Sequence, residues 1–136
     1  MNKRFEISNV DDTVCIFMND TDGILLEHIA FQYNEIAQHC MKIGFGIYNE
    51  QEIRDFLIFL HANMTDARFG DDGSKFVNFN NRQYAICLTW EQKRLLEFIM
   101  RCGIYKIVSA RGVFSESQII DFITAFYANL WFHYKD

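Results

Sequence analysis

Residues 46–64 read GIYNEQEIRDFLIFLHANM, and residues 112–130 read GVFSESQIIDFITAFYANL. The two stretches align without a gap, and their Gly, Glu, Ile, Asp, Phe, Ala and Asn positions include identical pairs. Self-similarity at a constant spacing is typical of a duplicated structural unit. The fold that we predict from the sequence is built around this pair of stretches.

Each stretch predicts a capped amphipathic helix. Asn49 with Glu52, and Ser115 with Gln118, have the spacing of a capping box, which satisfies free N–H groups at a helix start. Behind each cap, large apolar residues recur at helical spacing and predict a core-facing stripe. The stripe residues are Ile53, Phe56, Leu57, Leu60 and Met64 in the first stretch, and Ile119, Phe122, Ile123, Phe126 and Leu130 in the second.

Two weaker matches precede the long one in the same order, and each contains a shared cysteine. Their shared order favours a tandem duplication, whereas chance similarity between helices is the alternative. The changing offset predicts a longer connection around residues 19–28 in the first half and a longer later loop around residues 105–111. The matched ranges are 3–16 with 75–88, including Cys15 with Cys87, and 33–40 with 95–102, including Cys40 with Cys102.

Each half reads as a ββαα unit. In the first half, strands at residues 5–8 and 13–18 flank a polar turn, and one helix over residues 23–41 precedes the capped helix. In the second half, strands at residues 75–79 and 83–89 flank an Asn-rich turn, and a helix begins near Trp90.

A hairpin with two helices is marginal alone, but two copies can bury each other's faces. We therefore expect an α+β fold with a shared antiparallel sheet of about four strands, covered by four helices and related by a pseudo-twofold axis. The chain is predicted to be one domain, residues 1–136, with repeats at 3–66 and 75–136. Two discrete lobes are the alternative.

Composition excludes several classes of protein. Half of the residues are hydrophobic, which argues against a disordered chain, and the net charge of −5 argues against a nucleic-acid binder. No apolar run approaches the length of a membrane span, and the N-terminus lacks the apolar region of a signal peptide. All four cysteines lie in apolar runs, so we expect buried, reduced thiols and a cytoplasmic location.

No motif for catalysis, a cofactor or a metal stands out. Residues 19–23 resemble part of a calcium loop, but Ile29 stands where a glutamate ligand is required. Asp55 and Asp121 occupy matching positions, and a pair of carboxylates in a cleft is the functional alternative to a structural role. An enzyme would have to use His61, Asp55 or His28, and these residues do not form a known catalytic motif. We therefore expect no enzyme, cofactor or metal.

The aromatic end of the chain, residues 126–134, suggests a partner, although packing of these residues against the N-terminal hairpin is the simpler account. We expect a non-catalytic inhibitor of the immunity-protein, antitoxin or phage-inhibitor type, which masks a protein partner that has a basic surface. A pocket between the repeats that binds a nucleotide or metabolite is the alternative function, and a homodimer stays open. The predicted binding residues are Asp11, Asp12, Asp20, Asp22, Asp71 and Asp72 as an acidic rim, with Trp131, Phe132 and Tyr134 as anchors.

Overall fold

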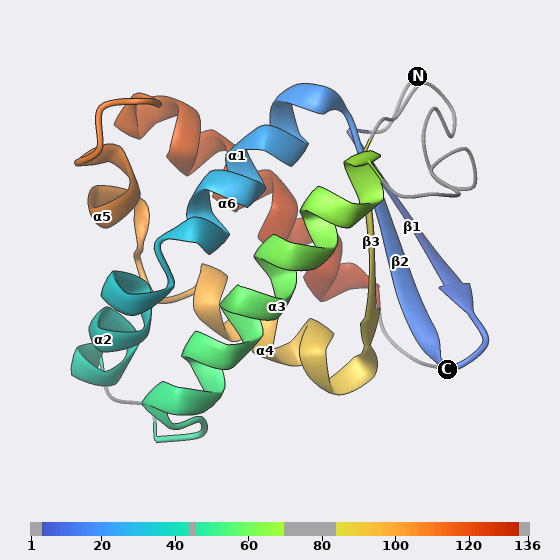
Figure 1. The fold of residues 1–136 in the computed structure, drawn as a ribbon, viewed down its shortest axis with the longest axis horizontal. Helices are drawn as coiled ribbons and strands as arrows, with labels where there is room; N and C mark the ends of the chain where they lie inside the picture. Colours follow the sequence, from blue (N-terminus) through green and yellow to red (C-terminus); the bar gives the residue numbers. More distant parts are fainter. Residues whose placement is uncertain (1–3, 44–45, 70–83, 134–136) are drawn as a thin grey trace.

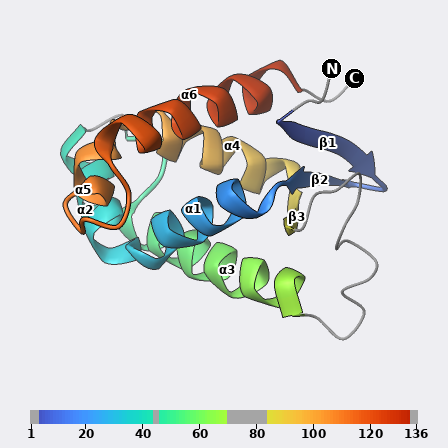
Figure 2. The same cartoon turned by 90° about the horizontal axis from the view of Figure 1, so that it is seen from above.

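A small sheet lies at one end of the molecule, and helices cover one of its faces (Figure 1). The computed structural model describes residues 4–43, 46–69 and 84–133. Figure 2 shows α6 along one side and α3 along the opposite side, with α1 and α4 between them. In chain order the elements are β1 (Phe5–Val10), β2 (Thr13–Met18), α1 (Asp20–Phe31), α2 (Tyr33–Ile43), α3 (Glu50–Phe69), β3 (Tyr84–Thr89), α4 (Trp90–Met100), α5 (Tyr105–Ser109) and α6 (Glu116–Phe132).

The sheet is antiparallel, in the order β1-β2-β3. β1 and β2 form the predicted hairpin, in which Val10 pairs with Thr13 across a tight turn. Asp11 takes a positive φ of 55° in this turn, a conformation that aspartate tolerates better than most residues. β2 pairs with β3 so that Cys15 lies opposite Cys87.

The predicted sheet of about four strands and the predicted set of four helices are both wrong. Across the described ranges the fold is α+β, with a three-stranded antiparallel sheet and six helices. The strand expected at residues 75–79 lies outside the described residues. The two additional helices arise because the helix expected over residues 23–41 is divided into α1 and α2, and because α5 occupies part of the expected loop at residues 105–111.

Gln32 divides the first predicted helix. Its backbone angles, φ −92° and ψ 42°, leave the helical region, and its Nε2 donates to the carbonyl oxygen of His28 at 3.3 Å. The break is invisible in the periodicity because Ile29 before it and Ile36 after it are both buried and lie two turns apart. Glutamine is also a good helix former, so its type does not indicate a break.

The strands alternate between two environments, as the period of a β-strand requires. Phe5, Ile16 and Ile86 are among the residues buried in the main core with the helices. Cys15, Phe17 and Ala85 form a second buried cluster, with Cys87 partly buried against it. Successive side chains along β2 therefore point alternately into the main core and onto the face that carries the disulfide.

The predicted caps and stripes are confirmed. Asn49 Oδ1 accepts the N–H of Glu52 at 2.8 Å, and Glu52 Oε1 accepts the N–H of Asn49 at 3.0 Å. Ser115 and Gln118 form the same reciprocal pair, at 3.1 and 2.9 Å. The stripe residues of α3 are buried, and so are those of α6 except Ile123, which is partly buried.

Candidate functional site

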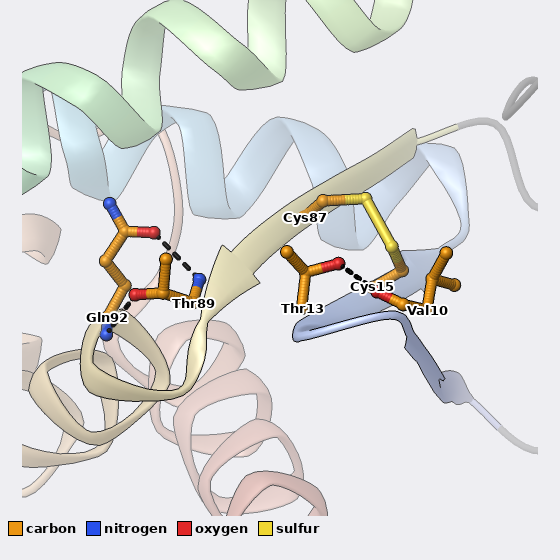
Figure 3. Close-up of a disulfide and its surroundings, with 6 residues drawn as sticks. All are labelled: Val10, Thr13, Cys15, Cys87, Thr89 and Gln92. Atoms are coloured by element: carbon orange, nitrogen blue, oxygen red, sulfur yellow. Dashed lines mark hydrogen bonds between the residues drawn. A yellow bond between two sulfur atoms is a disulfide. The ribbon is translucent and has the colours of Figure 1, made fainter.

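Two of the four cysteines form a disulfide (Figure 3). Cys15 of β2 and Cys87 of β3 are joined on the sheet face that carries the second cluster. The prediction of four reduced thiols is therefore wrong for this pair, because the register places the two residues directly opposite each other. Since disulfides persist mainly in oxidising compartments, the basis for predicting a cytoplasmic location is removed.

Cys40 and Cys102 remain free and buried, as predicted. The Cys102 thiol donates to the carbonyl oxygen of Phe98 at 3.2 Å. A hydrogen bond between the two thiols and burial raise the pKa of Cys40. The same hydrogen bond lowers the pKa of Cys102. Because only a thiolate is a good nucleophile, the raised pKa of Cys40 suits a structural cysteine.

Arg4 connects two of the acidic residues found in the sequence. Its guanidinium contacts both carboxylate oxygens of Asp22, at 2.8 and 2.9 Å, and Asp121 at 2.8 Å. The bonds to Asp22, and more weakly those to Asp121, raise the pKa of Arg4 and keep it charged. Asp22 is only 2% exposed, so its carboxylate serves the fold instead of an outer rim.

Three of the other predicted acidic residues are described, and they lie at the two ends of β2. Asp11 and Asp12 are exposed in the hairpin turn, whereas Asp20 is exposed in the first turn of α1. Asn19 caps this helix by accepting the N–H of Asp22 at 2.8 Å. Asp71, Asp72 and Tyr134 lie outside the described residues.

The outer side of α6 is unusually apolar for an exposed helix face. Trp131 is 56% exposed, Phe132 is 76% exposed and Ile120 is 42% exposed. The Trp131 ring stacks on that of Tyr127, with 6.2 Å between the centroids. The sequence of α6 contains two acidic residues and no lysine or arginine. These residues give the helix a surface that is apolar and acidic.

A groove of about 280 Å³ runs between α6 and β1. We call it the α6–β1 groove; its lining residues include Phe5, Glu6 and Ile7 of β1, Asn129 and Phe132 of α6, and His133. The exposed Phe132 therefore belongs both to the outer surface of the helix and to the wall of the groove.

His133 fastens the end of α6 to the hairpin. Its Nε2 lies 2.7 Å from Oδ1 of Asn9, two residues before the Asp11–Asp12 turn. Its ring stacks almost parallel to that of Trp90, with 5.8 Å between the centroids, and the ammonium group of Lys93 lies over the same Trp90 ring. These contacts bring the predicted anchor Phe132 to the same end of the molecule as the predicted acidic turn.

The residues considered for catalysis are not brought together. Asp55 on α3 is exposed and accepts a hydrogen bond from Gln51 at 2.6 Å, whereas Asp121 on α6 holds Arg4. Because α3 and α6 lie on opposite sides of the molecule, the two carboxylates do not form the alternative carboxylate pair (Figure 2). The His61 ring packs near Phe31, with the centroids 5.7 Å apart.

His28 is partly enclosed by residues of the second half. Its ring contacts that of Phe114 at 5.4 Å, and its Nε2 is buried without a hydrogen-bond partner in the part of the chain that the structure describes. Burial first, and then the charge of Arg111, lower the pKa of His28, while a hydrogen bond to the Val108 backbone opposes this shift. Among the described residues no group of three His, Cys, Asp or Glu could hold a metal ion.

A second pocket, of about 510 Å³, lies between the two predicted repeats, but the residues that line it were not predicted. Polar residues of α2 line one wall, and Ile107, Ala110 and Arg111 line the other. The signal in the sequence is the spacing of Glu35, His39 and Lys42 on one face of α2. The opposing residues come from a distant part of the chain, so the sequence alone does not reveal the pocket.

Comparison with protein-family models, with curated proteins and with solved structures finds no match for this chain. In the described ranges, no helix combines the length and the apolar character needed to cross a membrane.

Proposed function

We propose that this protein binds a partner protein through the outer side of α6 and the α6–β1 groove, and that it acts by masking the partner without catalysis. The observation that carries the proposal is the exposure of Trp131 and Phe132 beside a groove at the end of α6. The role would be that of an immunity protein, an antitoxin or a phage inhibitor, a class analogy that rests on size, charge and surface.

The apolar surface supports binding to a protein. Trp and Tyr are typical anchors of protein interfaces, and exposed aromatic residues beside a depression are typical of binding hot spots. When a partner covers apolar side chains outside the core-facing stripe of a helix, their removal from water stabilises the complex. Ile120, Tyr127 and Trp131 extend this apolar side along α6.

The charge distribution supports a basic partner. Glu6 lines the groove, Asp11 and Asp12 lie in the adjacent turn, and α6 contributes Glu116, whereas Asp121 is already paired with Arg4. With a net charge of −5 and no basic residue on α6, the surface would attract a positively charged protein and speed their encounter.

The contacts of His133 support a surface that is formed before binding. The hydrogen bond to Asn9 and the stack on Trp90 hold the last turn of α6 against the hairpin. A preorganised surface loses less conformational entropy when it binds, so more of the contact energy appears as affinity.

The first experiment is affinity capture from the native host, with mass spectrometry to identify the partner. The double variant Trp131→Ser/Phe132→Ser is expected to weaken partner binding by about 1,000-fold, because two hot-spot residues at about 2 kcal/mol each contribute about 4 kcal/mol together. Ile47→Ser is the matched control, since Ile47 is 66% exposed but precedes α3.

The two variants distinguish the outcomes. A partner that binds both variants as tightly as the wild type would overturn the proposed surface. Self-association that is lost only in the α6 double variant would assign the same surface to a homodimer instead of a foreign partner.

The second experiment tests the charges. Asp12→Lys is expected to slow association with the identified partner several-fold and to reduce its salt dependence, because the exposed turn adjoins the groove. Asp20→Lys, at the other end of β2, should have the smaller effect. Equal association rates for the wild type and Asp12→Lys would contradict steering by this turn.

A further inference from the structure

We infer that the pocket between α2 and α5 binds a small organic anion through a phosphate or carboxylate group. We call it the α2–α5 pocket; the residues used in the argument are Gln32, Glu35, His39, Lys42, Ile107 and Arg111. It lies at the end of the helical bundle far from the sheet (Figure 1). This site is therefore distinct from the α6–β1 groove and does not depend on the partner proposed above.

The wall contributed by α2 is polar throughout. Glu35, His39 and Lys42 follow one another at helical spacing on the pocket side of α2. Ile36, Ala37 and Cys40 lie on the other side of the same helix and are completely buried in the core. Consequently α2 cannot rotate to hide its polar side without exposing its core residues.

Two cations lie beside the pocket with unused binding capacity. Lys42 forms no ion pair with any residue in the described ranges, although it lines the pocket. Arg111 lies 3.7 Å from Glu35, longer than the 2.7–2.9 Å of a strong charge-assisted hydrogen bond. The guanidinium lies over the Phe31 ring, 5.7 Å from its centroid, which helps to position it.

Two further polar side chains are held in place. Gln32 is only 1% exposed, and its Nε2 donates to the carbonyl oxygen of His28. His39 must donate from Nε2 to the carbonyl oxygen of Cys102, at 2.7 Å, so this bond leaves its Nδ1 unused. Both side chains are therefore oriented by the fold before any ligand arrives.

The balance of charge favours an anion. Lys42 and Arg111 oppose the single carboxylate of Glu35 within a protein whose net charge is −5. The volume of about 510 Å³ lies within the range of small-molecule sites, and Ile107 and Ala110 offer apolar contacts for the body of a ligand. A small molecule with a phosphate or carboxylate group fits these features.

The inference is tested by calorimetry and NMR titration of the intact protein with inorganic phosphate, adenosine monophosphate and succinate. We expect at least one probe to bind and to shift the resonances of α2 and α5. The phosphate-containing probes and succinate distinguish a phosphate site from a carboxylate site. If none of the three probes binds at millimolar concentration, the inference is overturned.

Two matched variants distinguish binding in the α2–α5 pocket from a general attraction of anions to positive charge. Lys42→Gln is expected to weaken binding about tenfold, whereas Lys106→Gln, on the exposed side of α5, should leave it unchanged. Equal weakening by both would overturn the site.

Glu35→Gln provides a test that loss of folding cannot imitate. Removing this carboxylate is expected to strengthen anion binding several-fold, because it removes repulsion and releases Arg111. Weaker binding in this variant would contradict the proposed role of the two cations.

Discussion

Among the glycines that the structure describes, Gly23 in α1 is the one at which an added side chain would meet other atoms. A Cβ at this position would overlap the ring of Tyr84, which is completely buried. Gly23→Ala is therefore expected to destabilise the fold by about 1–3 kcal/mol, since overpacking outweighs the gain of about 0.5–1 kcal/mol from alanine in a helix. Urea unfolding would measure this change.

Thr21→Ala is the control for Gly23→Ala, because Thr21 is exposed in the same helix. It should change the free energy of unfolding by less than about 0.5 kcal/mol. If both variants were equally stable, the Tyr84 ring would have room to move and the packing argument would be wrong.

Arg4 forms ion pairs with one buried and one exposed carboxylate, so the contributions of the two pairs to stability can be compared. Arg4→Gln leaves the buried Asp22 without its cation and is expected to cost about 3 kcal/mol of unfolding free energy. Asp121→Asn breaks only the pair with a carboxylate that is 72% exposed, so it should cost less than about 1 kcal/mol. Thermal or urea unfolding of the two variants would measure the contrast, and equal losses would contradict it.

At the scale of elements, the disulfide joins β2 to β3. Removing it with Cys15→Ala/Cys87→Ala is expected to cost about 2–5 kcal/mol, because the cross-link restricts the unfolded chain. Alkylation of the denatured, non-reduced protein should label Cys40 and Cys102 only. Labelling of all four cysteines under these conditions would mean that the pair is reduced in the isolated protein.

The helix starts could be predicted from the sequence, but the helix breaks could not. The capping pairs at Asn49 and Ser115 act between residues three positions apart, so their spacing is visible in the chain. The break at Gln32 has no such local signal. α5 spans only Tyr105–Ser109, too short to show a helical period.

The order of the elements in the structure pairs different helices of the two halves than the sequence alignment did. α1 and α4 each begin directly after a strand, and Leu25, Leu26 and Ile29 of α1 are matched by buried Leu95, Leu96 and Ile99 of α4. The alignment of residues 33–40 with residues 95–102 instead compared α2 with α4. The duplication itself stays a prediction.

At the scale of the whole molecule, His28 couples stability to pH. The imidazole of α1 lies between residues of the second half, and its pKa is lowered in the fold. The unfolded chain therefore binds the proton more readily, and stability falls as the pH drops below the ordinary histidine pKa of about 6.5. Above that pH the contribution is constant.

Urea unfolding as a function of pH tests this coupling. The wild type is expected to lose more stability than His28→Asn as the pH falls from neutral toward the folded-state pKa of His28. At mildly alkaline pH His28 is neutral in both states, so the difference in unfolding free energy between the two proteins there gives the effect of the substitution without the proton. Parallel curves for the two proteins would show that His28 does not contribute to the acid sensitivity.

The features that act over a few residues follow from the sequence alone: the caps, the apolar stripes of α3 and α6, and the β1–β2 hairpin. The meeting of distant groups, in contrast, follows from tertiary packing. The Cys15–Cys87 bond, the contacts of Arg4 and the facing walls of the α2–α5 pocket each join parts of the chain far apart in sequence. Local spacing sets hydrogen bonds and periodicity within a segment, whereas strand register and helix packing depend on how all the segments bury their apolar faces together.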